Sequence, residues 1–555
     1  MQGAQNNLRQ VYQLRISTPN ASIRRSMRQD FCSTLEGTMR RLNFFLACLT
    51  LATAANHAQT PASKLSTPEA RADRAFRAAV KDGPLALHAF LAEFPKGADL
   101  HVHLSGAVYA ESFIRAAGKD GLCVDTVALS FVKPPCAAPL VPASAVPANQ
   151  DLYDRLINAF SMRSFVPTSG QSAHDHFFAT FTRFGGISKS HTGEWVDEAA
   201  SRAAAQNQQY LELMETPLFS HAASIAHEIG WNPEQQDFTR LRQALLEHGL
   251  RDEVAADRED VHSAEARRRQ IEQCDTAKAA PACQVEIRYI YQVLRGAPPE
   301  QVFAQTLLGF ETIQTSMTGL EPGFVGINFV QPEDGFISMR DYILQMRMLD
   351  YLHSVYPHVP ISLHAGELAP GLSPPEGLRF HIRQAVELGH AQRIGHGVDI
   401  LYEDNAPALL KELAQRHIMV EINLSSNEAI LGVKGAEHPF PLYRAAHVPV
   451  ALSTDDEGVS RIDITHEYVR AALDYRLSYQ DLKQLARTGM EHNFLPGESL
   501  WAAEDVFTAP AAPCRAQPLG EEKLTAACKA YLDKSEKAAA QWELERRFRV
   551  FEAKF

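Results

Sequence analysis

The sequence predicts an α/β protein, a single (β/α)₈ barrel of the TIM type with an N-terminal helical extension and insertions. Eight short apolar segments of strand-like composition follow one another along the chain, and helix-like sequence follows them. The chain has 555 residues, 45% of them hydrophobic and 22% charged, which suffices for a large core. Four of the segments end in histidine or acidic residues, and a barrel brings these ends to one face.

The predicted strands alternate with segments of helical periodicity, and most are bounded by polar or glycine-containing sequence. They occupy Gly97–His103, Tyr210–Met214, Val285–Val293, Phe324–Val330, Pro360–His364, Arg393–His396, Ile418–Ile422 and Val448–Ser453.

The chain before the barrel divides into three predicted segments. Residues 1–38 are polar and Arg-rich without hydrophobic periodicity, which indicates an upstream extension that is disordered or not translated. Residues 39–58 combine two arginines, a short apolar run and small residues, the pattern of a secretory signal peptide that starts at Met39. Residues 59–95 form a helical segment.

The barrel itself is expected over residues 96–510, followed by a C-terminal helical segment at 511–555. Within it, residues of about 119–150 are rich in Pro, Ala and Val and lack clear periodicity, so we predict an insertion there.

Cysteine usage supports export. Two of the eight cysteines, Cys32 and Cys48, precede the predicted cleavage point, and the other six form three pairs of near neighbours. Six cysteines allow fifteen connectivities, so the local pairing is a hypothesis. Disulfides persist in oxidising compartments, which predicts a periplasmic or secreted protein. The hypothetical pairs are Cys123 with Cys136, Cys274 with Cys283, and Cys514 with Cys528.

The charge balance argues against two classes of partner. The net charge is −12, and because residues 1–58 contribute +5, the rest of the chain carries −17. Nucleic acids and anionic membranes are bound through Lys and Arg, so neither is expected beyond the export signal. The oligomeric state stays open, a homodimer included.

The first strand carries His101-Val102-His103, and residues two apart on a strand point to the same side. With 22 histidines in the chain, about one such pair is expected by chance, so the pair alone is weak. A second pair, His174-Asp175-His176, opens a helix-like run, where positions two apart diverge by about 200°. We expect only the first pair to converge on a metal ion.

Three later strands also end in residues suited to metal binding or proton transfer. These are His364 with Glu367, His396 between two glycines, and the adjacent Asp455 and Asp456. Singly, each has an ordinary structural explanation as a core histidine, a helix cap or a turn residue. Together, all at carboxyl ends of strands, they predict one site with a metal centre and acid–base groups.

These motifs resemble those of the adenosine deaminase family, which belongs to the metal-dependent amidohydrolase barrels. The matching stretches are Leu100–Gly106, His364–Glu367, Ile394–Gly397 and Ser453–Asp456, and they stand in the family's order. The leader and the cysteine-bearing insertion are most similar to the secreted, growth-factor-related branch.

The resemblance implies one zinc ion per chain and a hydrolytic deaminase acting on a cyclic amidine. The implied reaction converts adenosine or 2′-deoxyadenosine into the inosine counterpart and ammonia. Glu367 is then the proton donor to the purine, His396 a base or an electrostatic support for the attacking water, and Asp456 an orienting group. The implied zinc ligands are His101, His103, His364 and Asp455.

Two positions depart from the family pattern, and both concern the substrate. Ser105 stands where compact members carry an aspartate that contacts the ribose, and Gln331 stands where a glycine usually approaches the purine. With Gly106 and Asn427, these residues are expected to bind the substrate. Two alternatives stay open: a deaminase of another aminopurine, such as adenine or a modified adenosine, and a secreted binding or growth-factor-like protein on the same fold.

Overall fold

The computed structural model describes residues 67–316 and 323–555. The predicted upstream extension and signal peptide lie outside the described residues, so export and the location of the protein stay predictions. Within the described part, no helix combines the length and apolar character needed to cross a membrane. The barrel strands are β1 (Gly97–His103), β5 (Gln208–Glu215), β6 (Glu286–Leu294), β7 (Phe324–Val330), β8 (Ser362–Ala365), β9 (Arg393–His396), β10 (Met419–Ile422) and β11 (Val450–Leu452).

These eight parallel strands close into a ring. One sheet has the order β1-β5-β6-β7 and the other has the order β11-β10-β9-β8. Single parallel bridges join both pairs of edges, Ile327 with Ile361 and Val102 with Asp455. The predicted (β/α)₈ barrel is therefore present, and all eight predicted strands coincide with its strands to within a few residues.

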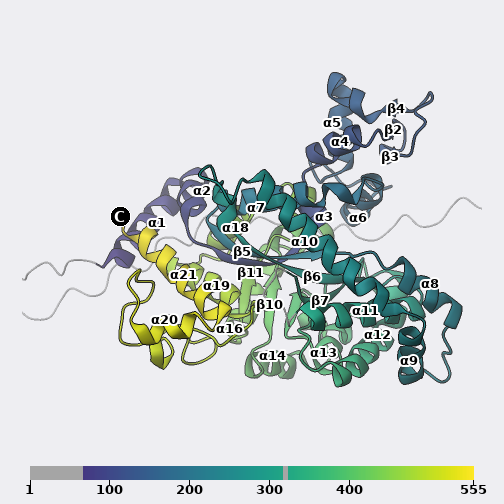
Figure 1. Ribbon diagram of the computed structural model, residues 1–555. Helices are drawn as coiled ribbons and strands as arrows, with labels where there is room; N and C mark the ends of the chain where they lie inside the picture. Colours follow the sequence, from purple (N-terminus) through teal and green to yellow (C-terminus); the bar gives the residue numbers. More distant parts are fainter. Residues whose placement is uncertain (1–66, 317–322) are drawn as a thin grey trace, which may run out of the picture. The chain divides into compact units, whose positions relative to one another are not determined.

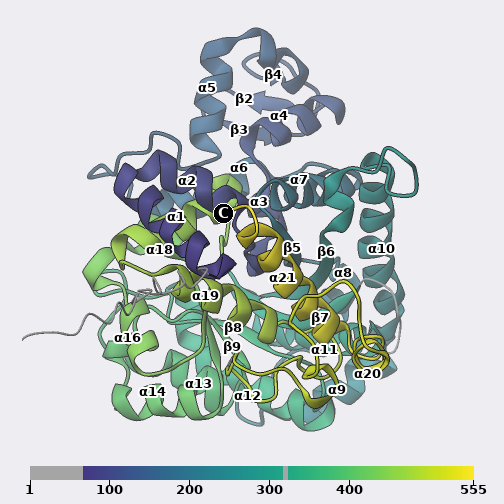
Figure 2. The same ribbon diagram turned by 90° about the vertical axis from the view of Figure 1, so that its left-hand side faces the viewer.

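Helices surround the strands and bury their apolar faces against them (Figures 1 and 2). The barrel strands are buried over nearly their whole length, as expected for a parallel sheet covered on its outer face. The barrel-associated helices are α7 (Thr192–Ala205), α8 (Ser220–Ile229), α9 (Phe238–Glu247), α10 (Val254–Ile271), α11 (Pro299–Ser316), α12 (Phe336–Val355), α13 (His381–Glu387), α14 (Ala406–Gln415), α15 (Leu424–Leu431), α16 (Phe440–Ala445), α17 (Glu457–Ser460), α18 (Ile464–Asp474) and α19 (Tyr479–Glu491).

The N-terminal and C-terminal helices pack together beside α19. The N-terminal helical segment breaks at Gly83, which has φ +107° and separates α1 (Pro68–Asp82) from α2 (Pro84–Glu93). Aromatic rings of α2 and α21 (Glu536–Glu552) meet, with Phe90 5.2 Å from Phe551. The C-terminal segment also contains α20 (Ala526–Leu532).

The insertion between β1 and β5 is larger than predicted. The sequence placed it at about 119–150, but a second hydrophobic core draws on residues from Val108 to Phe184, together with Ile430 of α15 and Val459 of α17. The flanking helices have ordinary amphipathic patterns, so the sequence could not show that they pack against one another. After the short helix α3 (Leu104–Ala107), which packs in the barrel core, the insertion contains α4 (Ala110–Lys119), then β2 (Cys123–Asp125), β3 (Ser130–Val132) and β4 (Val141–Pro142), then α5 (Gln150–Ala159) and α6 (Ala173–Arg183).

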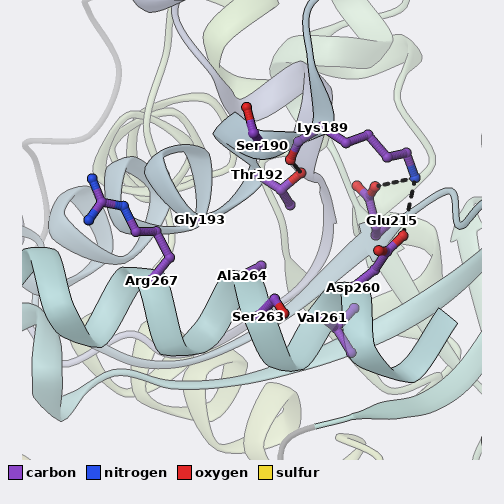
Figure 3. A pocket seen from close by; sticks show the side chains of 10 residues that line it. All are labelled: Lys189, Ser190, Thr192, Gly193, Glu215, Asp260, Val261, Ser263, Ala264 and Arg267. Carbon is purple, nitrogen blue, oxygen red and sulfur yellow. Dashed lines mark hydrogen bonds and ion pairs between the residues drawn. The ribbon is translucent and has the colours of Figure 1, made fainter. Parts of the chain in front are cut away.

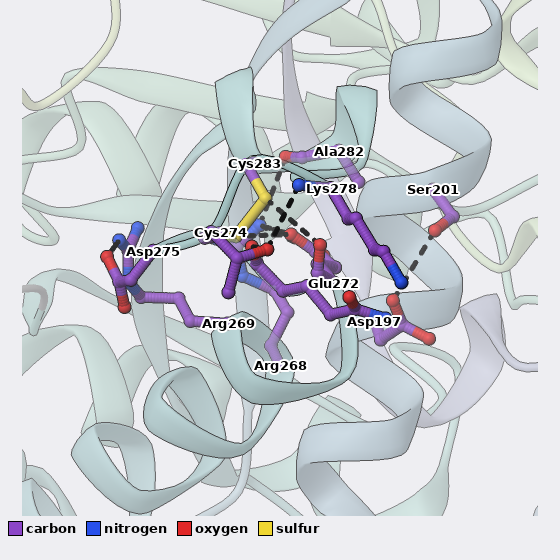
Figure 4. The surroundings of a disulfide bond; sticks show 12 residues. Asp197, Ser201, Arg268, Arg269, Glu272, Cys274, Asp275, Lys278, Ala282 and Cys283 are labelled. Atoms are coloured by element: carbon purple, nitrogen blue, oxygen red, sulfur yellow. Dashed lines mark hydrogen bonds and ion pairs between the residues drawn. A yellow bond between two sulfur atoms is a disulfide. The ribbon is translucent and has the colours of Figure 1, made fainter.

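All three cysteine pairs hypothesised from the sequence are disulfides in the structure. The Cys123–Cys136 bond tethers β2 to the loop after β3, and the Cys514–Cys528 bond lies in a small core near α20. The Cys274–Cys283 bond closes the loop after α10, beside Arg268 and Glu272 (Figure 4). Each bond closes a short loop, so each stabilises its own region.

We expect the double substitution Cys123→Ser/Cys136→Ser to destabilise the insertion by about 2–3 kcal/mol, because a short-loop disulfide restricts the unfolded chain by about that amount. Hydrogen exchange of the β2 and β3 amides measures the effect. Cys514→Ser/Cys528→Ser is the matched control and should leave these amides unchanged. Equal protection of β2 in both variants would contradict the prediction.

Candidate metal centre and active site

Three histidines and one aspartate converge at the carboxyl ends of β1, β8 and β11. The Nε2 atoms of His103 and His364 lie 3.2 Å apart. The Oδ1 atom of Asp455 lies 3.2 Å from Nε2 of His103 and 3.5 Å from Nε2 of His101. The four residues predicted as zinc ligands are thus brought together from positions up to 354 residues apart.

The spacing and the free lone pairs fit a zinc ion. Zinc–nitrogen and zinc–oxygen bonds of about 2.0–2.1 Å in a tetrahedron place ligand atoms about 3.3–3.4 Å apart, close to the separations observed here. Nε2 of His101 is buried and has no hydrogen-bond partner in the structure, which a metal bond would satisfy. His396 also lies within this group of potential ligands.

Outer partners orient the three rings so that each Nε2 faces inward. Nδ1 of His101 donates to Glu421 Oε2 at 2.6 Å, and Nδ1 of His364 donates to Asn328 Oδ1 at 2.8 Å. The side-chain amide of Gln292 contacts Nδ1 of His103. The acceptor oxygens of Glu421 and Asn328 hold the proton of each ring on Nδ1, which leaves Nε2 of His101 and His364 free and raises its basicity.

The sequence analysis missed these outer partners. Gln292, Asn328 and Glu421 are polar residues flanked by apolar, buried residues on their strands, and that pattern is the signal that could have identified them. Ser426 was also missed; its hydroxyl donates to Asp455 Oδ2 at 2.5 Å.

A chain of buried charges continues behind His101. Arg393 Nε lies 2.7 Å from Glu421 Oε1, and Arg393 Nη1 lies 2.6 Å from Glu212 Oε2. All three side chains are fully buried, so each charge depends on its partner. The guanidinium also stacks on the ring of Phe494, 3.9 Å from its centroid.

The electrostatics of the centre favour positive charge at His101. Burial lowers the pKa of His101, but the nearby carboxylates of Asp455 and Glu421 outweigh burial and raise this pKa to about 10. Burial also lowers the pKa of His364 well below its usual value, so that ring is neutral. A histidine ligand must be unprotonated, so the low pKa of His364 suits metal binding, and at His101 the carboxylates that favour a proton would equally favour a bound cation in its place.

Glu367 lies in the turn after β8, and Glu333 holds that turn. Glu333 accepts hydrogen bonds from the backbone N–H groups of Gly366 and Glu367, at 3.0 and 2.8 Å, and from His381 Nδ1 at 2.5 Å. Gly366 has φ +78°, a conformation that glycine permits at no steric cost. Burial and the negative charges of Asp455 and Glu333 raise the pKa of Glu367 well above its usual value.

His396 and Asp456 complete the site. Burial lowers the pKa of His396 to about 3, so the ring is neutral. Burial and the adjacent Asp455 raise the pKa of Asp456 well above its usual value. His396 and Asp455 have φ +68° and +63°, left-handed conformations that cost non-glycine residues about 1–3 kcal/mol and concentrate at functional sites.

The predicted substrate-binding residues lie in different surroundings. Ser105 is half-buried at the start of α3, and Gly106 packs so closely against Asp456 that a Cβ would lie 1.4 Å from Asp456 Oδ1. Gln331 has φ +89°, and its Oε1 accepts from the N–H of Gly296 at 2.7 Å. Asn427 is fully buried against His396, with its Nδ2 2.9 Å from Nδ1 of that ring. Substrate contact by these four residues stays a prediction.

Two other features do not form part of this centre. His174 and His176 lie on α6, where His174 contacts Asp334 at 3.1 Å and His176 stacks on Phe165. A surface cavity of about 270 Å³ lies between α10 and the start of α7 (Figure 3). There the ammonium of Lys189 is already paired with Glu215 and Asp260, at 3.7 and 3.8 Å.

The family model for adenosine deaminase matches residues 194–505, more than half of the chain. The chain belongs to the adenosine deaminase family. It is 34% identical over 196 residues to an adenosine deaminase of Shewanella loihica, a match covering 35% of this chain and 50% of that protein. An adenosine deaminase of Escherichia coli is 37% identical over 150 residues, covering 27% of this chain and 42% of the relative. The matches thus span about half of the length of these family members, or less.

Solved structures of related barrels share low sequence identity with this family member. A zinc-bound amidohydrolase from Burkholderia ambifaria has 16% identity and a TM-score of 0.49, covering 84% of this chain and 95% of that chain. An adenine deaminase from Arthrobacter aurescens has 16% identity and a TM-score of 0.44, covering 72% and 94%. The family assignment therefore rests on the sequence match. The likeness to the secreted, growth-factor-related branch stays a prediction.

We expect zinc to raise the melting temperature of the metal-free protein and His101→Ala to abolish the shift, because that substitution removes a ligand. At a zinc concentration of about 100 times Kd, binding stabilises a protein by about 2.7 kcal/mol. Thermal denaturation with and without zinc, together with metal content, checks this. His174→Ala, from the other His-x-His pair, should behave like the unaltered protein. Loss of zinc binding in that control would contradict the assignment of the metal ligands.

Proposed function

We propose that this protein is a zinc-dependent hydrolase that removes the exocyclic amine of an aminopurine nucleoside, with adenosine and 2′-deoxyadenosine as substrates. The observation that carries the proposal is the meeting of three imidazole Nε2 atoms and Asp455 beside the buried carboxyl of Glu367. His101, His103, His364 and Asp455 would hold the metal. When bound, zinc acts as a Lewis acid and lowers the pKa of water toward neutrality.

The protein's own groups supply the proton transfers. Attack at the amine-bearing carbon places electron density on the neighbouring ring nitrogen, which needs a proton donor. Glu367 holds that proton, because burial and neighbouring negative charges keep its pKa high. The neutral His396 and Asp456 flank the same centre and can orient the attacking water.

A second candidate is the same chemistry on another aminopurine. Ser105 favours it, because a neutral hydroxyl replaces the carboxylate that the family uses at the ribose. Gln331 supports a different substrate less strongly than the sequence indicated. Its backbone keeps a glycine-like φ of +89°, and its side chain accepts a hydrogen bond from Gly296. The binding-protein alternative is weakened by the presence of every proposed ligand and proton carrier.

Ammonia release by the zinc-loaded protein, measured separately with adenosine, 2′-deoxyadenosine and adenine, tests the proposal. We expect release with the two nucleosides and not with adenine. Release with adenine alone would replace the nucleoside assignment by the second candidate. Absence of release with all three, despite one zinc per chain, would overturn the proposed function.

Glu367→Gln should retain zinc but lower turnover by about 100- to 10 000-fold, the usual contribution of a positioned general acid. Because the reactive form of Glu367 is protonated, the rate of the unaltered enzyme should fall as pH rises through the raised pKa. Steady-state kinetics across pH check both points. Glu376→Gln, an exposed carboxyl on the same loop, is the control. Full turnover in Glu367→Gln would refute the donor assignment.

Gly106→Ala should displace Asp456, because the new methyl would meet Asp456 Oδ1 at 1.4 Å. A displacement of about 1 Å in an active site lowers turnover by about 100-fold. Zinc content should be retained, since the three atoms nearest to the new methyl all belong to Asp456, which is not a proposed ligand. Gly170→Ala, where no atom lies within 4 Å of the new Cβ, should leave turnover unchanged. Equal rates in the two variants would contradict this role of Gly106.

A further inference from the structure

We infer that a buried relay from the Phe440 backbone through His438 and Asn427 holds His396 as its Nε2–H tautomer, so that His396 donates a hydrogen bond toward the metal centre and does not act as the base. The inference rests on the proposed function for its catalytic meaning. The tautomer itself follows from the hydrogen bonds. Asn427 and His438 are then positioning residues.

The relay begins at a donor whose direction is unambiguous. The backbone N–H of Phe440 donates to Nδ1 of His438 at 3.1 Å. A nitrogen that accepts a hydrogen bond carries no proton, so the ring of His438 is neutral and its proton is on Nε2. That Nε2 lies 2.9 Å from Oδ1 of Asn427, and it therefore donates to the amide oxygen.

The orientation of the Asn427 amide determines which nitrogen of His396 accepts a hydrogen bond. Because its oxygen faces His438, its NH₂ group faces the ring of His396, with Nδ2 2.9 Å from Nδ1. Nδ1 of His396 is therefore an acceptor, and the proton of the neutral ring is on Nε2. The amide nitrogen of Asn423 lies 3.3 Å from the same Nδ1 and 3.5 Å from Nε2.

The surroundings of His396 favour this tautomer over the other. An Nδ1–H would face the NH₂ group of Asn427, and its nearest carboxylate oxygen, Glu367 Oε1, lies 3.6 Å away. Nε2 lies on the side of the metal ligands, 3.9 Å from Asp455 Oδ2. His396 and Asn427 are fully buried and His438 is 2% exposed, so bulk water does not compete with the relay.

The consequence for the reaction is a choice between two roles that the sequence left open. A ring with its proton on Nε2 can stabilise developing negative charge on the attacking oxygen but cannot take a proton at that atom. Proton uptake from the water must then fall to another group or to solvent.

Imidazole ¹⁵N NMR of the histidine-labelled, zinc-loaded protein tests the inference without reference to activity. We expect protonated Nε2 and unprotonated Nδ1 for His396 and His438 at neutral pH. A protonated Nδ1 on His396, or a doubly protonated ring, would overturn the inference. If the tautomer is as expected but no substrate is deaminated, the proposed function fails and the relay stands.

Two substitutions test the catalytic meaning. Asn427→Asp replaces the NH₂ donor by an acceptor of the same shape, so His396 should become the Nδ1–H tautomer and turnover should fall by about 100- to 1000-fold, as when one oxyanion donor is lost. His438→Gln is the matched control, since an amide can also accept a hydrogen bond from Phe440 and donate one to Asn427. This variant should keep the tautomer of His396 and most of the turnover.

An unchanged rate in Asn427→Asp with the tautomer reversed would show that Nε2–H is not needed. An unchanged tautomer in that variant would refute the relay.

Discussion

Two backbone hydrogen bonds at Asp455 close the barrel, and the candidate metal centre depends on them. The N–H of Asp455 donates to the carbonyl of His101 at 2.9 Å, and the N–H of His103 donates to the carbonyl of Asp455 at 3.0 Å. These three residues are three of the four proposed metal ligands, and their side chains converge with that of His364. Closure of the barrel and assembly of the centre are therefore the same structural event.

Buried ion pairs stabilise the barrel interior beneath the candidate metal centre. Glu421, Arg393 and Glu212 lie fully buried on three different strands and are linked by contacts of 2.6–2.7 Å. Burying such charges is costly unless each is paired, so the pairing fixes the relative positions of β5, β9 and β10. Glu421 also accepts a hydrogen bond from Nδ1–H of His101, which connects these buried charges to the proposed metal ligands.

Residues remote in sequence position the proposed acid–base groups. Glu333 holds the turn of Glu367, Asn427 contacts His396, and the missing side chain of Gly106 leaves room for Asp456. Left-handed backbone at His396 and Asp455 adds strain that the surrounding contacts must offset. The chemistry of the site thus depends on loops that are held rigid.

The sequence by itself determined the eight barrel strands, the strand-end residues of the site and the three cysteine pairs, because hydrophobic periodicity and local spacing report local structure. Only the tertiary structure decided the extent of the insertion, the outer partners Glu421, Asn328 and Gln292, and the surroundings of Asn427 and Gln331. These depend on contacts between residues far apart in the chain. Periodicity carries no information about which buried polar side chain will meet which, and the folded barrel settles that pairing.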